Sequence, residues 1–130
     1  MHIETQHYAD TIVAAPAGRI DHRSAAELEA ALAPLLEQTG AARGALVLDF
    51  ARVDYISSVG LRVLMVAAKQ MRAQQARLSV AALQSVVAEI FTISRFDKVL
   101  TVCVTLDDAL AQGSSAALAA YRAARPSSTT

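Results

Sequence analysis

Two adjacent serines, Ser57 and Ser58, precede Gly60 at the predicted start of a helix and are the residues best placed for chemistry. The first backbone N–H groups of a helix have no partner within the helix. With Ser57 as the N-cap, its hydroxyl accepts from the N–H of Val59 or Gly60, and the Ser58 hydroxyl stays free at the first helical position. The spacing therefore predicts one serine that stabilises the helix start and one whose hydroxyl is accessible to a partner. A capped helix start without chemistry is the simpler interpretation.

A free hydroxyl at this position is suited to phosphorylation. Phosphate would add about −1.5 to −2 charges to Ser58, and the positive end of the helix dipole favours an anion by ~0.3–1 kcal/mol. A partner shaped around the neutral hydroxyl would instead bury a dianion without a cation, which costs roughly several kcal/mol. Phosphorylation of Ser58 is therefore predicted to preserve the fold and to weaken a partner's binding, as a switch does.

Nucleophilic catalysis is the other chemistry that a presented serine allows. A serine hydrolase needs a base within hydrogen-bond reach, and in an α/β fold it usually has a Gly-x-Ser-x-Gly turn. No glycine stands two residues before either serine, and the nearest histidine is His22, beside Asp21. Glycine-rich phosphate loops, catalytic carboxylate pairs and metal-ligand spacings are also missing from the sequence. We therefore predict a protein that is not an enzyme and uses no metal and no cofactor.

The helix after Ser57 shows two apolar stripes. At 100° per residue, the stripe predicted to lie on a sheet comprises Leu61, Leu64, Met65, Ala68 and Met71. The second stripe comprises Val59, Val63 and Val66, on roughly the opposite side of the helix. A helix on a small sheet ordinarily carries polar residues there, so the valines predict a docking surface beside Ser58. Cover by a neighbouring helix or a homodimer contact is the alternative.

The elements that must position the serines alternate along the chain. Predicted strands span residues 3–8, 11–15, 45–50, 78–82 and 99–104. Predicted helices include residues 25–36 with a stop at Gly40, then run from Ser57 to about residue 77, from 85 to about 95, and from 107 to 113. The pattern predicts an α/β fold with a mixed, mostly parallel five-stranded sheet, an opening hairpin and about four helices. Ser24 and Glu27 resemble a capping box of the first helix, and Asp21 is the alternative cap.

Composition limits the kinds of partner. The 130 residues fit one domain. Twelve basic and twelve acidic residues give a formal net charge of +0, which disfavours binding to nucleic acid or to an anionic membrane surface. No run reaches the ~18 apolar residues of a membrane span, and the first residues do not resemble a secretion signal. With a single cysteine, Cys103, predicted to be a core residue, the composition predicts a cytoplasmic protein whose partner is a protein or a small molecule.

Residues 1–113 are predicted to form the domain. The alanine-rich residues 114–130 are predicted to add a helical extension, with Ser114 or Ser115 as its cap, and then a flexible tail over residues 123–130, where Pro126 stops any preceding helix.

The segment Asp54–Leu64 resembles the signature of the STAS domain, the domain of sulfate transporters and anti-sigma factor antagonists. Gly18–Asp21 is similar to the family's Gly-x-Leu-Asp before the first helix, and residues 91–107 are similar to its closing helix and strand. The resemblance covers about residues 3–112. Many members have Asp immediately before the phosphorylated serine, where this chain has Ser57.

The resemblance implies a partner-switching regulator of transcription. In bacterial anti-sigma factor antagonists of this family, the serine two residues before the glycine is phosphorylated, which maps to Ser58. The kinase is an anti-sigma factor of the histidine-kinase-like ATPase type. The unphosphorylated antagonist binds this kinase, and the sigma factor is thereby freed. A PP2C-type phosphatase removes the phosphate and restores the antagonist. The predicted partner-binding residues are Asp21, Ser57, Val59, Gly60, Val63 and Val66. A STAS subunit of a lipid-transport or signalling scaffold complex, never phosphorylated, is the alternative.

Overall fold

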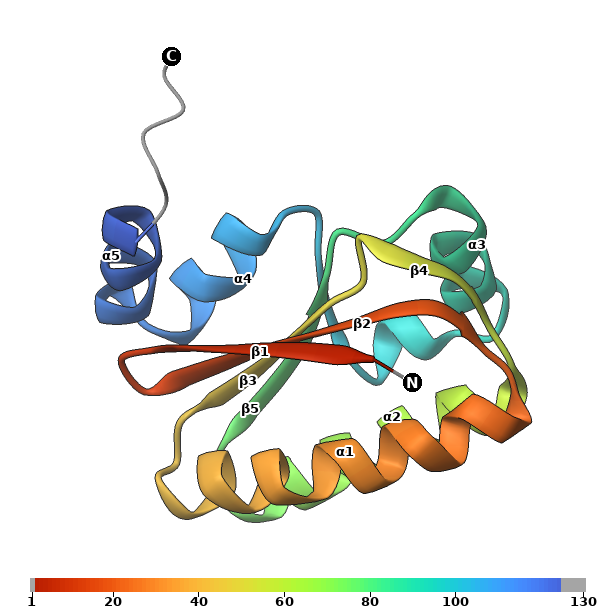
Figure 1. Cartoon of the computed structure of the whole chain (residues 1–130), viewed down its shortest axis with the longest axis horizontal. Coiled ribbons are helices and arrows are strands. Elements are labelled where there is room, and N and C mark those ends of the chain that lie inside the picture. Colours follow the sequence, from red (N-terminus) through yellow and green to blue (C-terminus); the bar gives the residue numbers. More distant parts are fainter. Residues whose placement is uncertain (1, 125–130) are drawn as a thin grey trace.

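Strands and helices alternate through residues 2–124, which are the residues that the computed structural model describes (Figure 1). In chain order the elements are β1 (Ile3–Tyr8), β2 (Thr11–Ile20), α1 (His22–Ala41), β3 (Ala45–Asp49), β4 (Arg52–Ile56), α2 (Ser58–Ala73), β5 (Arg77–Ala81), α3 (Ser85–Ile93), the 3-10 turn η1 (Phe96–Lys98), β6 (Thr101–Cys103), α4 (Leu106–Gly113) and α5 (Ser115–Ala124). Residues 125–130, most of the predicted tail, lie outside the described residues.

The sheet is mixed and mostly parallel, as the sequence predicts. Its strand order is β1-β2-β3-β5-β6, with β1 antiparallel to β2 and the other neighbouring pairs parallel. The opening hairpin is confirmed. The described part of the sheet has six strands rather than the predicted five, because β4 pairs with the second half of β2.

The missed strand, β4, pairs with an extension of β2 that was not predicted. The predicted strand ends at residue 15, but β2 continues to Ile20, and its register with β4 shifts between Gly18 and Arg19, where β4 has one extra residue, Asp54. Gly18 has a φ of +93°, a backbone conformation that glycine adopts without strain. β2 therefore pairs with β3 from Thr11 to Ala14 and with β4 from Ala17 to Ile20, and Gly18 accommodates the irregular backbone at the register shift.

Helix ends also differ from the prediction. Gly40 lies inside α1, which ends at Ala41, and α2 ends at Ala73, so that Arg77 begins β5. There are five α-helices within residues 2–124: the four predicted for the domain and the predicted helical extension, α5. The fifth, α5, follows Ser114, whose hydroxyl accepts from the N–H of Ala117 at 3.1 Å, as expected of a cap.

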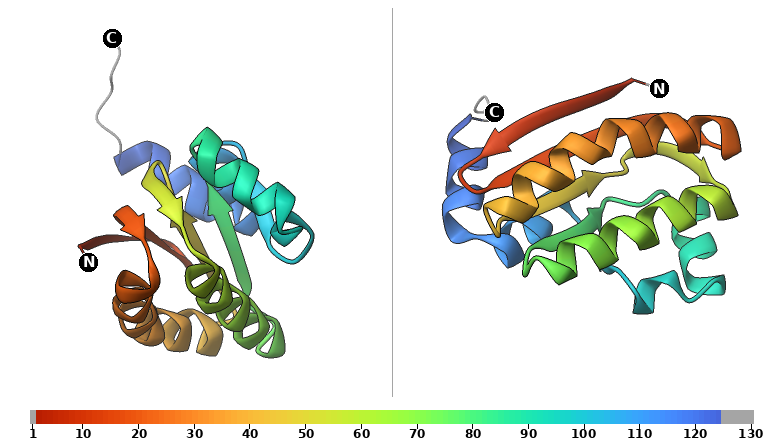
Figure 2. Two further views of the ribbon diagram at one scale, coloured as in Figure 1. Left: turned by 90° about the vertical axis from the view of Figure 1, so that its right-hand side faces the viewer. Right: turned by 90° about the horizontal axis from the view of Figure 1, so that it is seen from below.

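Helices cover both faces of the sheet. In Figure 2, α1 and α2 lie side by side on one face, whereas Figure 1 shows α4 and α5 on the other. The core beneath α1 and α2 is mostly aliphatic, with Leu28, Leu46 and Leu64 fully buried, and it also contains a cluster of three aromatic rings, Phe50, Phe91 and Phe96. Cys103 belongs to the second core, beneath α4 and α5, as predicted. Burial raises the pKa of its thiol, which keeps it protonated at neutral pH. None of the helices within the described range is long and apolar enough to cross a membrane.

Candidate functional site

The candidate site lies where two parallel strands each pass directly into a helix. Strands β2 and β4 are register partners at Ile20 and Ile56, and α1 and α2 begin within two residues of these positions. The backbone N–H of Ser57 donates to the carbonyl of Ile20 at 2.8 Å, which joins the two strand ends. The two helix starts therefore lie next to each other at one end of the molecule (Figure 1).

Ser57 and Ser58 occupy the positions that their spacing predicts. Ser57 is the N-cap of α2, and its hydroxyl accepts from the N–H of Gly60 at 3.2 Å. Ser58 is the first helical residue and is exposed. The structural part of the prediction is therefore confirmed: one hydroxyl is used by the cap, and the other is accessible to a partner.

Gly60 lets α2 approach the strand ends closely. It is buried, and a Cβ at this position would lie 2.8 Å from side-chain carbons of both Ile20 and Ile56. Because atoms do not approach each other so closely, any larger residue would push the start of α2 away from the sheet. Gly60 thus serves the site by positioning Ser58 rather than by offering surface.

Asp21 is the N-cap of α1. Its Oδ1 accepts from the N–H groups of Arg23 and Ser24 at 3.0 Å each, and Ser24 Oγ accepts in return from the Asp21 N–H at 2.9 Å. The predicted capping box of Ser24 with Glu27 is wrong, because α1 begins at His22 and Ser24 is its third residue. The hydrogen bond from the Ser24 N–H is the main cause that lowers the pKa of Asp21, so this cap is ionised at neutral pH.

Two further side chains at the site, Arg19 and Tyr55, were not singled out from the sequence. They are register partners on β2 and β4, and the Arg19 guanidinium carbon lies 4.1 Å from the centre of the Tyr55 ring. Arg19 Nε also lies 3.9 Å from Asp21 Oδ2. Each stands two residues before the N-cap of its helix, and this shared spacing is the signal that could have paired them. They add an exposed cation and a ring beside the start of α2.

The valine stripe faces solvent only in part. Val59 is 44% exposed and Val66 is 50% exposed, as expected, but Val63 is half-buried against the main core. The expectation for Val63 is wrong because α2 packs beside α1 as well as on the sheet. A groove of about 320 Å³ remains between the two helices, where Val63 and Val66 face Leu32 and Leu36 of α1. The alternative interpretation, that a neighbouring helix covers the stripe, is therefore correct for Val63.

Substituting Ser57 tests its structural role. Ser57→Ala should lower the free energy of unfolding by about 0.5–2 kcal/mol, because the Gly60 N–H loses its acceptor. Ser58→Ala is the matched control and should change stability by less than about 0.5 kcal/mol, since its hydroxyl is exposed. Chemical denaturation of both variants measures this. Equal losses would show that Ser57 does not act as the cap.

Comparisons with known proteins agree on one family. The model of the STAS domain matches residues 2–109. BtrV of Bordetella bronchiseptica, named as a candidate anti-sigma factor antagonist, is 38% identical over 115 residues, which are 88% of this chain and 90% of BtrV. An anti-sigma factor antagonist from Mycobacterium paratuberculosis has a TM-score of 0.75 at 26% identity, over 86% of this chain and 92% of that one.

The fold is also similar to that of the Bacillus cell fate determinant SpoIIAA. Its unphosphorylated form gives a TM-score of 0.70 at 17% identity, over 85% of this chain and 95% of that one. Its phosphorylated form gives 0.63 at 16% identity, over 85% and 98%. At these identities the likeness concerns the fold alone.

Proposed function

Given that the chain belongs to the STAS domain family, we propose that it is an anti-sigma factor antagonist whose binding is switched by phosphorylation of Ser58. Unphosphorylated, it binds an anti-sigma factor kinase and so frees a sigma factor; phosphorylated on Ser58, it releases the kinase. The relatives compared above are named as regulators rather than as enzymes, which supports a protein that acts by binding.

The observation that carries this proposal is that the hydroxyls of the two serines have different roles. Ser57 uses its hydroxyl to cap α2, whereas Ser58 presents an exposed hydroxyl one residue later. A kinase can reach Ser58 without unfolding the helix start. Because the N-terminus of α2 is the positive end of its dipole, the added phosphate would not oppose the fold.

The surface around Ser58 combines apolar, charged and aromatic side chains that the kinase can contact. Val59 is an exposed apolar residue directly beside Ser58, and Val66 extends the apolar surface along α2. Arg19, Asp21 and the half-buried Tyr55 supply charge and a ring at the adjoining strand ends. Such a patch can bind tightly around a neutral hydroxyl and lose that affinity when the hydroxyl becomes a dianion.

The remaining partners follow from the same proposal. The kinase is expected to be of the histidine-kinase-like ATPase type, and a PP2C-type phosphatase would return Ser58 to its unphosphorylated state. Because the switch uses ATP and acts on a sigma factor, the proposal places the protein in the cytoplasm.

Locating the phosphate tests this function. After incubation of the purified protein with the cognate kinase and ATP, mass spectrometry should find one phosphate, on Ser58. Ser58→Ala should take up none, and Ser57→Ala should still be modified. Phosphate on Ser57 would overturn the assignment. Kinase binding without any phosphate would favour the alternative, a STAS subunit of a lipid-transport or signalling scaffold complex.

A further inference from the structure

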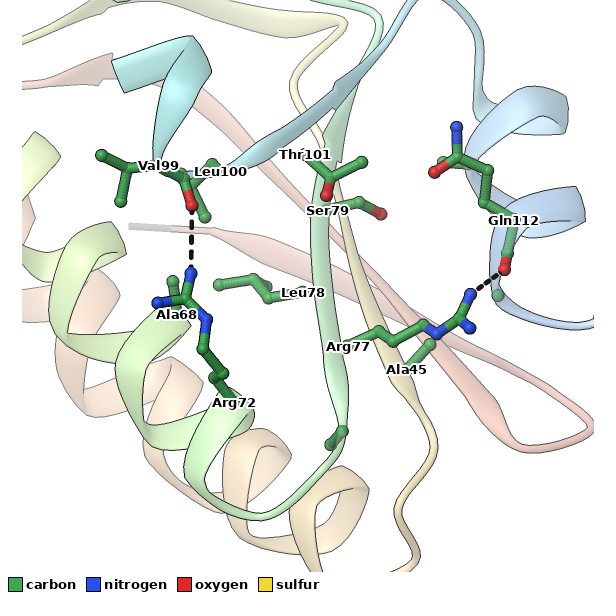
Figure 3. Close-up of a pocket in the computed structure, with 13 residues that line it drawn as sticks. Ala45, Ala68, Arg72, Arg77, Leu78, Ser79, Val99, Leu100, Thr101 and Gln112 are labelled. Carbon is green, nitrogen blue, oxygen red and sulfur yellow. Dashed lines mark hydrogen bonds between the residues drawn. The ribbon is translucent and has the colours of Figure 1, made fainter. Parts of the chain in front are cut away.

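A pocket of about 270 Å³ lies at the opposite end of α2 from Ser58 (Figure 3). Arg72, in the last turn of α2, contributes to its wall. Ser58 and Arg72 are separated by about 21 Å along the helix axis, from a rise of about 1.5 Å per residue. The pocket is therefore distinct from the proposed phosphorylation site.

The pocket exists because β6 is shorter than its neighbour β5. The first residue of β6, Thr101, pairs with Ser79, so Arg77 and Leu78 at the start of β5 have no strand beside them on that side. The end of α2, residues 99–100 and α4 close around the resulting notch. The strand pairing itself thus leaves an opening at this corner of the sheet.

Two guanidinium groups reach this opening from different elements. Arg72 extends from α2 and donates to the carbonyl of Val99 at 3.4 Å, while Arg77 extends from β5 and donates to the carbonyl of Gln112 (Figure 3). A guanidinium has five N–H donors, so most remain available on each side chain. Within residues 2–124, the pocket has no acidic residue in its lining, and neither arginine is within ion-pair distance of a carboxylate.

Two hydroxyls and an apolar wall complete the pocket. Ser79 and Thr101 are register partners, and both side chains lie on the same face of the sheet as Arg77, whereas Arg72 lies on the other side of β5 (Figure 3). Alanine and leucine side chains, including Ala68, Leu78 and Leu100, form much of the remaining lining. The pocket therefore combines a cationic, hydrogen-bonding part with an apolar part.

We propose that this pocket binds a small organic anion: a carboxylate or a phosphate monoester attached to an apolar group about the size of a benzene ring. The Arg77 guanidinium can pair with the oxygens of either head group through parallel hydrogen bonds, and the Ser79 and Thr101 hydroxyls on the same face can donate to a further oxygen. An apolar cavity of about 150 Å³ is known to hold benzene. The present pocket therefore has room for such a ring together with its charged head group.

Calorimetric titration of the full chain with phenyl phosphate and with benzoate tests the proposal and distinguishes the two head groups. Arg77→Gln should raise the Kd of the tighter ligand about tenfold or more, since it removes a charge-assisted contact, and Arg72→Gln, on the other side of β5, should raise it less. Thr101→Val, which keeps the shape of the side chain, should raise it by about two- to fivefold. Arg23→Gln, an exposed arginine on α1, is the matched control and should leave it unchanged.

Amide chemical shifts of the wild-type protein give a reading that does not depend on any variant. Addition of phenyl phosphate should shift the amides of Ser79, Leu100 and Thr101 and leave those of Ser58 and Val59 in place. Absence of binding by both ligands at 10 mM, shifts confined to the Ser58 end, or an unchanged Kd in Arg77→Gln would overturn the proposal. Equal affinity for inorganic phosphate and phenyl phosphate would overturn the assignment of an organic anion.

Discussion

Phosphorylation of Ser58 should weaken the binding of the anti-sigma factor by at least about a hundredfold, which corresponds to about 2.7 kcal/mol. The hydroxyl is exposed beside the apolar Val59, so a kinase that covers both residues would have to bury the new charge. Burying a dianion that the partner does not neutralise costs roughly several kcal/mol. Calorimetric titration of the kinase with unphosphorylated and phosphorylated protein measures the difference.

Two substitutions separate charge from loss of the hydroxyl. Ser58→Asp should weaken binding less than phosphate does, because a carboxylate carries about one charge instead of about two. Ser58→Ala should bind the kinase within a few-fold of wild type and should stay bound in the presence of ATP. Neither change should lower the melting temperature, since the Ser58 hydroxyl is exposed and the dipole at the start of α2 tolerates an anion. Equal affinity of phosphorylated and unphosphorylated protein would remove the switch from the proposed function.

The serine pair was predictable because its geometry is local. An N-cap, the residue after it and a glycine two residues later lie within one helical turn, so their relative positions follow from helix geometry. The sheet-facing stripe of α2 was predictable for the same reason: Leu61, Leu64 and Met71 are buried as their spacing indicates. Periodicity reports the side of a helix that faces the core, wherever that core lies.

The features that the sequence did not reveal depend on contacts between distant segments. The pairing of β4 with the second half of β2 joins segments that are distant in the sequence, places Arg19 beside Tyr55, and has its register shift next to Gly18. The sequence shows that glycine only as an interruption of the strand pattern. Similarly, no periodicity within α2 indicates that α1 lies beside it. Val63 therefore looked exposed from its own helix, although the neighbouring helix partly covers it.

The largest expected loss of folding stability on α2 is at Leu64. This side chain is 0% exposed in the core beneath α1 and α2, so Leu64→Ala should lower the free energy of unfolding by roughly 2–5 kcal/mol through the cavity that it leaves. Val66, two residues further along, is 50% exposed, and Val66→Gln should change stability by less than about 0.5 kcal/mol. Val63→Gln should fall between them because Val63 is half-buried. Thermal or chemical denaturation of the three variants gives this order.

The same variants distinguish a docking surface from a structural one. If the kinase covers Val66, Val66→Gln should weaken kinase binding by about 1 kcal/mol or more, roughly fivefold. The variant should nevertheless remain as stable as wild type. Leu64→Ala should affect binding only in proportion to the fraction of protein that it unfolds. A Val66→Gln protein that binds the kinase as tightly as wild type would place the interface elsewhere. Arg19, Asp21 and Tyr55 at the strand ends would then be the surface to substitute next, because they are the other described side chains that flank the start of α2.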